Sequence, residues 1–484
     1  MNRYRIGKIE GSWVNFVPPI QGGTFRTRQE IEEDDLQRQV IREADSSSSA
    51  SPEPSPIFDE DGNHELRLRA APKSDSASSV SSEAPEDAFT DGMSYLDSIT
   101  REKIDLDLDK YPAVDLDTQA SVVVKYRALH QRIKDAGLYQ CNYWAYAAES
   151  ISYLGLAYLT HYFVTTGSYF WGGLALGALW HQLVFTAHDA GHMGITHGYY
   201  TDSIIAIIIA DYIGGLSMGW WKLSHNTHHI VTNSPEHDPD IEHMPLFAVS
   251  HRFMENLRST YYDKIMKYDA FAKVLLRIQP WTYYPILSLA RFNLYRLSWD
   301  YLLAGRGPRK GQAAWLRWFE IVGQVFFWTW FGYGVCYKMI PDNWSRFVFV
   351  MTCNISSSPL HLQIVLSHFA MSTADLGPQE SFPQKMLRTT MDVDCPVWLD
   401  WFHGGLQFQA IHHLYPRIPR HNLRATQKLV QDFCNDVGIP YALYGFARGN
   451  GEVIGKLSEV ARQAKILAKC QETITKKGDM MHMH

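Results

Sequence analysis

The sequence predicts an all-α integral membrane protein with four transmembrane helices in two hairpins, in-plane helices and a cytosolic cap. Apolar runs of membrane-spanning length occur in two pairs, and the long segments that follow each pair are rich in Lys and Arg. Seven histidines form three tight clusters at the margins of the predicted membrane helices. The mean hydropathy of the 484-residue chain is mildly negative only because polar and apolar stretches alternate.

The N-terminal part divides into three segments of different composition. Residues 1–26 mix aromatic, Gly and Pro residues and look like a fragment of a folded domain. Residues 27–93 are rich in Ser, Pro, Glu and Asp, which predicts a disordered linker because too little apolar area can be buried. An amphipathic pattern over residues 94–140 predicts surface-lying helices that open a membrane domain over 94–450. A helical tail is expected over 451–484.

Two hairpins account for the four predicted spans. Residues 144–166 and 168–187 form the first pair, and residues 319–340 and 346–371 form the second. Each run is close to the ~20 apolar residues that a membrane helix needs. The first twenty residues lack the apolar core of a cleavable signal peptide, so membrane targeting is expected to come from these internal segments.

A shorter apolar run at 203–219 is expected not to cross the membrane. Asp211 and a pair of glycines interrupt it, which favours an in-plane or re-entrant segment. The basic segments 222–318 and 372–484 belong in the cytosol by the positive-inside rule. A full crossing at 203–219 would put histidines before and after it on opposite faces of the membrane.

Cysteine usage and charge exclude other classes of protein. The six cysteines are scattered and form no CxxC pair, which argues against a disulfide scaffold and against a cysteine zinc site. The net charge of −6 and the lack of a basic tract predict no nucleic-acid partner.

Two histidine motifs have the spacing of one helical face. His188 and His192 stand at positions i and i+4, just after the second apolar run. His225, His228 and His229 stand at i, i+3 and i+4, so their three rings share a face. Packing explains such a set poorly, because each imidazole carries polar nitrogens that need partners.

A third motif repeats this spacing near the C-terminus. Gln409, His412 and His413 stand at i, i+3 and i+4, and His368 ends the last apolar run. Residues 236–240 carry carboxylates that can accept the outer N–H of a metal-bound imidazole and fix its tautomer. An imidazole set without cysteine suits iron or zinc. Eight imidazoles are too many for one ion, so the predicted cap holds two metals.

Other histidines are expected to be structural or at the surface, because a single histidine is more often that than a ligand. These are His161, His197, His251 and His421.

With these motifs the chain resembles the membrane fatty-acyl and sphingolipid desaturases. That family carries HxxxH, HxxHH and a final HxxHH or QxxHH, and this chain shows HDAGH, HNTHH and QAIHH in the same order. The Gln at the start of the third motif marks the front-end group, and residues 400–417 are similar to that group's sequence pattern. The resemblance covers roughly residues 100–450. Within the group, the sequence most resembles the fungal sphingolipid Δ8-desaturases. Ile411, which stands where many front-end relatives carry Glu, is shared with that fungal branch.

The resemblance implies a site with two non-haem iron ions in an endoplasmic reticulum membrane, with the metal site and both termini cytosolic. His368 and Gln409 are carried over as additional metal ligands. The residues implied to be both catalytic and iron-ligating are His188, His192, His225, His228, His229, His412 and His413.

One departure from the family concerns the electron donor. Front-end desaturases begin with a cytochrome b5 domain whose His-Pro-Gly-Gly motif helps to bind haem. No such motif occurs here, and His64 is the only histidine before residue 130. Residues 1–26 are interpreted as a remnant of that domain, so haem binding by this chain is not expected. Electrons are expected from cytochrome b5 and its NADH-dependent reductase.

The implied reaction is an oxygen-dependent desaturation of the long-chain base of ceramides or other sphingolipids, with Δ8 as the expected position. A front-end fatty-acyl desaturase and a lipid hydroxylase that stops after the first hydrogen abstraction remain alternatives. A zinc-dependent membrane ceramide hydrolase is a further alternative, because zinc also accepts His and Asp ligands. No box histidine is missing, so nothing supports an inactive scaffold.

Overall fold

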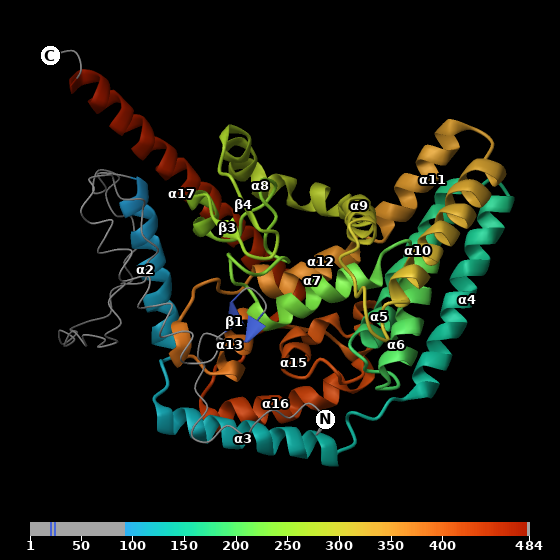
Figure 1. Ribbon diagram of the computed structural model, residues 1–484, viewed down its shortest axis with the longest axis horizontal. Coiled ribbons are helices and arrows are strands. Elements are labelled where there is room, and N and C mark those ends of the chain that lie inside the picture. Colours follow the sequence, from blue (N-terminus) through green and yellow to red (C-terminus); the bar gives the residue numbers. More distant parts are fainter. Residues whose placement is uncertain (1–19, 22–23, 26–91, 482–484) are drawn as a thin grey trace. The chain divides into compact units, whose positions relative to one another are not determined.

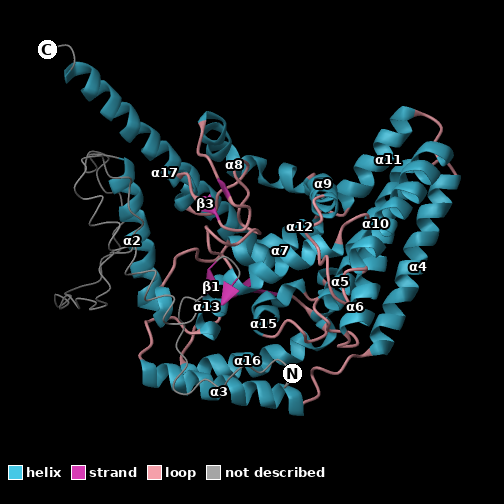
Figure 2. Ribbon diagram, viewed as in Figure 1, coloured by secondary structure: helices cyan, strands magenta, loops and turns pink. Residues whose placement is uncertain are grey.

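The computed structural model describes residues 20–21, 24–25 and 92–481 (Figure 1). The part from residue 92 onward is mainly helical, with only short strands (Figure 2), as the sequence predicts. The segments predicted as a domain remnant and a linker lie outside the described residues, apart from a short antiparallel pair. In that pair β1 (Ile20–Gln21) lies beside β2 (Thr24–Phe25).

Four long helical segments form a bundle of two hairpins. α4 (Tyr143–Thr165) turns into α5 (Tyr169–Gly191), and α10 (Leu316–Phe327) continues as the π-helix η4 (Trp328–Met339) before α11 (Asn343–Ser356) (Figure 1). The side chain of Asn142 caps the start of α4 by accepting from the backbone N–H of Ala145. Asp342 caps α11 in the same way.

Glycines bring α5 and α11 into close contact. An added Cβ on Gly173 would lie 2.9 Å from the carbonyl oxygen of Phe349, and one on Gly177 would lie 2.6 Å from that of Cys353. Either side chain would therefore push the two helices apart. This close approach fixes α5 against its neighbour just below the first histidine motif.

The last predicted span is divided. The sequence predicts one segment over 346–371 that Pro359 kinks, whereas α11 ends at Ser356 and a separate helix, α12 (Pro359–Phe369), begins at the proline. Proline is favoured in a first helical turn, because it has no N–H to donate and its φ suits a helix.

Within residues 92–481, no single helix has the length and apolarity of a membrane span. Two helical segments, Tyr199–Ile213 and Met218–Val231, have that length and apolarity only when taken together, and they are bent by 117° at the break between them.

The bend explains the interrupted apolar run. α6 (Tyr199–Ile207) continues as the π-helix η2 (Ile208–Ile213), and the chain then turns into α7 (Met218–Val231). Asp211 accepts from the backbone N–H of Met218, and Glu320 accepts from the hydroxyl of Ser217. Both carboxylates are buried at the start of α7, where the helix dipole favours negative charge. Asp211 therefore interrupts the run because it caps the next helix.

The cap is built from the segments outside the bundle. One buried core joins α2, α8, α12 and α17, and a second joins α3, α13, α15 and α16. β3 pairs with β4 antiparallel, and β5 pairs with β6 in parallel. The bounds of these further elements are α2 (Gly92–Lys110), α3 (Leu116–Asp135), η3 (His251–Glu255), β3 (Arg258–Ser259), β4 (Lys264–Ile265), α8 (Ala270–Ser288), α9 (Ala290–Leu303), η5 (Gly377–Gln379), α13 (Phe382–Thr389), β5 (Asp392–Asp394), η6 (Val397–Leu399), α14 (Asp400–His403), η7 (Leu406–Phe408), α15 (Gln409–Leu414), η8 (Arg420–Asn422), α16 (Leu423–Val437), β6 (Leu443–Gly445) and α17 (Phe446–Met481).

Candidate metal centre

The three histidine motifs converge where α5, α7 and α15 meet the end of α12. α5 contributes the first motif at its C-terminus, and the second lies along one face of α7. α15 carries the third, and His368 is the penultimate residue of α12. The eight imidazoles, which are separated by up to 225 residues in the chain (188 to 413), form one cluster in which six rings are buried and two are half-buried.

Four histidines make the first group. One imidazole nitrogen from each ring lies within 4.8 Å of one nitrogen in each of the other three rings. The four residues are His188, His192, His225 and His412. The ring centroids of His188 and His412 are 4.5 Å apart, and those of His192 and His225 are 5.0 Å apart. All three motifs therefore contribute to this group.

Three histidines make the second group. His228, His368 and His413 are all buried, and one nitrogen from each lies within 4.8 Å of the others. The Nε2 atoms of His228 and His368 are 3.3 Å apart. This group joins the second and third motifs to the last helix of the second hairpin.

His229 lies between the two groups. Its Nε2 is 3.1 Å from Nε2 of His225, and its ring stacks on that of His413 with centroids 4.2 Å apart. Gln409 is buried at the first residue of α15. Its role as a ligand stays a prediction. His361, two helical turns before His368, belongs to neither group among the described residues.

The chemistry of the donors suits metal binding. The Nε2 atoms of His192, His412 and His413 are buried and have no hydrogen-bond partner in the described part of the chain. Buried polar atoms without a partner are rare and call for an unseen one. Burial and the neighbouring imidazoles hold the pKa of His229, His412 and His413 well below the usual range. These rings are therefore neutral, which is the form that binds a metal.

A buried carboxylate orients the second group. Nδ1 of His228 donates to Asp238, with Nδ1–oxygen distances of 2.9 and 3.0 Å, so Nε2 is the nitrogen that points toward His368. Burial opposes protonation of His228, but Asp238 and Asp240 outweigh it and raise its pKa to about 9. Unlike the neutral rings of His229, His412 and His413, this ring therefore has to release a proton from Nε2 when it binds a metal. Asp240 also approaches His225, with Oδ2 lying 3.8 Å from Nδ1. This is the arrangement that the sequence predicts for residues 236–240.

Asn233 is a site residue that the sequence does not reveal. It follows α7 with a φ of +58°, in the left-handed region that Asn tolerates. Its Nδ2 donates to the carbonyl oxygens of His368, Ser372 and Thr389 at 2.9 to 3.1 Å. No spacing rule marks an isolated Asn as a contact between helices.

Arg420 is a second such residue. The guanidinium is buried and donates to Asp189, which lies inside the first motif, at 2.5 Å. It also forms an ion pair with Glu149 of α4, which in turn accepts from His421 at 2.9 Å. Arg420 thereby fixes the first motif to α4 and to the segment that follows the third. The structural role expected of His421 fits this contact.

Comparison with known proteins places these motifs in a family. The fatty acid desaturase family model matches residues 166–445. A Delta 8-(E)-sphingolipid desaturase of Emericella nidulans is 57% identical over 485 residues, which cover 100% of this chain and 87% of the relative. One of Lachancea kluyveri is 46% identical, covering 98% of this chain and 84% of the relative. Delta(8)-fatty-acid desaturase 2 of Arabidopsis thaliana is 35% identical over 60% of this chain and 63% of the relative. The family resemblance seen in the histidine motifs is thus confirmed, and the chain belongs to the fatty acid desaturase family.

Proposed function

We propose that this protein is an oxygen-dependent desaturase that introduces a double bond at the Δ8 position of the long-chain base of ceramides or related sphingolipids. The convergence of all three histidine motifs into two buried groups carries the proposal. The names of the relatives at 46% and 57% identity support the sphingolipid substrate and the position.

The two histidine groups suit two iron ions, one in each group. His229 would lie between the ions, and Gln409 would be a further ligand. Bound iron supplies the redox chemistry by which dioxygen and two external electrons remove two hydrogens from unactivated methylenes. The protein's own residues hold that centre and exclude water, because six of the eight histidines are buried and the other two, His188 and His229, are half-buried.

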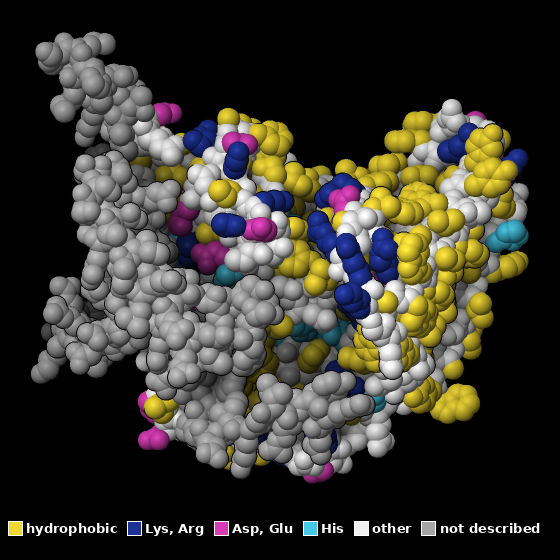
Figure 3. Space-filling model, in the orientation of Figure 1, with side chains coloured by type: hydrophobic (Ala, Val, Ile, Leu, Met, Phe, Trp, Pro, Cys, Tyr) yellow, Lys and Arg dark blue, Asp and Glu magenta, His cyan; other side chains and the backbone are white. Residues whose placement is uncertain are grey.

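We also propose four membrane spans, made by α4, α5, α10 with η4, and α11 with α12. α4 has 23 residues and is about 34 Å long, enough for a hydrocarbon core of about 30 Å. Hydrophobic side chains cover the outer face of these helices (Figure 3). An exposed Trp lies in the first turns of each hairpin helix, as expected at a membrane boundary. These are Trp144, Trp171, Trp318 and Trp344.

The proposed topology keeps residues 203–219 on one side of the membrane. His192 precedes this segment and His225 follows it, yet their ring centroids are 5.0 Å apart. Both ends of the segment therefore return to the same place, which supports a re-entrant or in-plane path. We place the metal site and both termini in the cytosol at the endoplasmic reticulum. Cytochrome b5 and its NADH-dependent reductase are the proposed electron donors, because no side chain supplies electrons.

The test is sphingoid-base profiling of a yeast that lacks Δ8 activity and expresses either the natural chain or His412→Ala. A new double bond in ceramide bases is expected only with the natural chain, at equal amounts of protein in the membrane fraction. Normal product from His412→Ala would contradict the metal assignment. A double bond in acyl chains would indicate a fatty-acyl desaturase, and a hydroxylated product would indicate a hydroxylase. Zinc in place of iron in the purified protein would favour a hydrolase.

A further inference from the structure

α8 has apolar side chains on two opposite faces. On the face toward the cap, Tyr283 lies against Phe369 of α12 with ring centroids 6.3 Å apart. The opposite face is exposed, and large apolar residues recur on it every three or four positions, the spacing of a helical stripe. The stripe consists of Phe271, Val274, Ile278 and Trp281, of which Trp281 is 84% exposed. A helix that is apolar on both faces is normally covered on both, so the stripe indicates a partner.

α8 is connected to the cytosolic end of a proposed span. α8 and α9 both contact α11, and residues 304–315 join α9 to the start of α10, where Trp315 and Trp318 are exposed. In the proposed topology the start of α10 is its cytosolic end. Hydrophobic side chains cover α8 as they cover the outer face of the bundle (Figure 3). An apolar helix at this level meets the boundary between acyl chains and headgroups, where Trp is also favoured.

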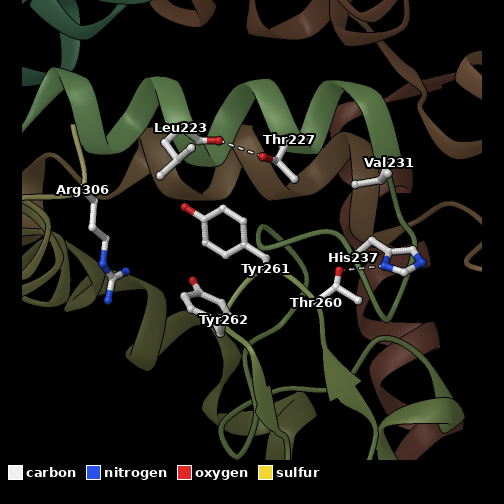
Figure 4. Close-up of a pocket in the computed structure, with 8 residues that line it drawn as sticks. All are labelled: Leu223, Thr227, Val231, His237, Thr260, Tyr261, Tyr262 and Arg306. Atoms are coloured by element: carbon white, nitrogen blue, oxygen red, sulfur yellow. Dashed lines mark hydrogen bonds between the residues drawn. The ribbon is translucent and has the colours of Figure 1, made fainter. Parts of the chain in front are cut away.

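The chain around the stripe is strongly basic. Residues 270–319 contain eight Lys and Arg but a single acidic residue, Asp300, which pairs with Arg296 at 2.6 Å. Three exposed cations of this segment make no side-chain hydrogen bond or ion pair with a described residue, namely Arg277, Arg306 and Lys310. Arg306 also borders a pocket of about 670 Å³ beside α7, which leaves room for a headgroup next to its guanidinium (Figure 4). The charge of this segment is therefore complementary to anionic phospholipids.

From the apolar stripe and its basic surroundings we infer that α8 lies in the cytosolic leaflet and binds anionic phospholipids there. The side chains from Phe271 to Trp281 enter the acyl-chain boundary, while Arg277, Arg306 and Lys310 bind the phosphates of the headgroups. A second copy of this chain fits the surface less well, because a symmetric contact would bring two basic segments together. The inference rests on the proposed membrane spans but not on the proposed reaction.

Photo-crosslinking tests the apolar stripe. The full chain is reconstituted into vesicles of phosphatidylcholine and phosphatidylserine that contain traces of both lipids with a diazirine in one acyl chain, and adducts are mapped by mass spectrometry. Adducts are expected on residues 271–281 and, as a positive control, on Ile151 and Leu154 of α4, which are both 72% exposed. α16, on the other side of the cap from α8 (Figure 1), should carry none.

The pattern of adducts separates this inference from the proposed spans. Adducts on α4 without adducts on α8 would overturn the inference and leave the spans standing. If neither helix is labelled, the spans fail as well. Protein–protein cross-links at the stripe in place of lipid adducts would assign it to a second copy or to another protein, and the inference would again be wrong.

Charge variants test the preference for anionic headgroups. A first triple variant replaces the three unpaired cations near the stripe, as Arg277→Gln, Arg306→Gln and Lys310→Gln. The ratio of phosphatidylserine to phosphatidylcholine adducts on α8 is expected to fall by at least about fivefold, the effect of a single cation near an anionic leaflet. The matched control removes three exposed cations of α3 and α16 that form no ion pair with a described residue, as Arg127→Gln, Lys134→Gln and Lys428→Gln. It should leave the ratio unchanged. An unchanged ratio in the first variant, or an equal fall in both, would overturn the headgroup site.

Discussion

The side-chain amide of Asn233 donates a hydrogen bond to the backbone carbonyl of His368 over 2.9 Å. Asn233 ends the segment that carries the second histidine motif. His368 is the penultimate residue of α12, the helix that brings a histidine of the second hairpin into the second group. The same amide also bonds the carbonyls of Ser372 and Thr389. One buried side chain thus fixes α7, α12 and α13 relative to one another.

Asn233→Gly is expected to lower the metal content of the second group and the melting temperature in detergent. Glycine keeps the positive φ but leaves three buried carbonyls without this donor, at a cost of about 1–3 kcal/mol each where water cannot replace it. Asn233→Ala should be worse, because alanine adds backbone strain. Metal analysis and thermal unfolding measure both effects. Full occupancy in both variants would show that α12 is positioned without this contact.

Asp238→Asn is expected to weaken metal binding by about 10- to 100-fold with little change in the amount of folded protein. The asparagine side chain has the size of the carboxylate, but it lacks the negative charge that attracts the Nδ1–H of His228. The ring then loses the orientation that directs Nε2 toward the second group. Competition with a graded series of chelators measures the loss. Asp300→Asn, which changes an exposed ion pair with Arg296, is the control and should bind metal normally.

Single-histidine variants test the division into two groups. His192→Ala should retain about one ion per chain through the second group, and His413→Ala about one through the first. Both should lack product, because the reaction needs both ions. Metal-to-protein ratios and lipid analysis are the measurements, and His161→Ala, which changes an exposed residue of α4, should behave as the natural chain does. Loss of both ions from each variant would show that the groups bind metal only together.

A pH dependence of stability is expected from Glu242 in the cap. Burial raises the pKa of this carboxyl from 4.5 to about 7, and the hydrogen bond from Ser259 offsets only part of the effect. Its Oε1 is buried without a partner among the described residues. Since the folded pKa lies above the unfolded one, the stabilising contribution is complete below pH 4.5 and is lost as the pH rises through about 7.

Glu242→Gln should remove this part of the pH dependence. The neutral amide has no ionised form to desolvate, so the variant should melt above the natural chain at pH values higher than the folded pKa and lose the advantage at acidic pH. Thermal unfolding across the pH range measures the slope. Equal slopes for the two chains would mean that Glu242 is already ionised in the folded protein.

Local patterns accounted for much of the fold and for the members of the candidate site. Apolar runs predict helices at α4, α5, α10 and α11, because about 20 consecutive apolar residues are themselves the signal. Helical spacing predicts that the rings within each motif share a face. The sequence predicts a kink at Pro359 but not a complete break between Ser356 and Pro359, because a helix boundary depends on which backbone groups find partners in three dimensions.

The sequence by itself determined which histidines are candidate metal ligands and to which family the chain belongs, because both depend on residue type and on spacing within a few turns of helix. Only the tertiary structure decided how those histidines divide. His225 and His228 are three residues apart on α7, yet they belong to different groups. His412 and His413 are adjacent and also separate. The division follows from how α5, α12 and α15 pack around α7, which depends on contacts between residues far apart in the chain.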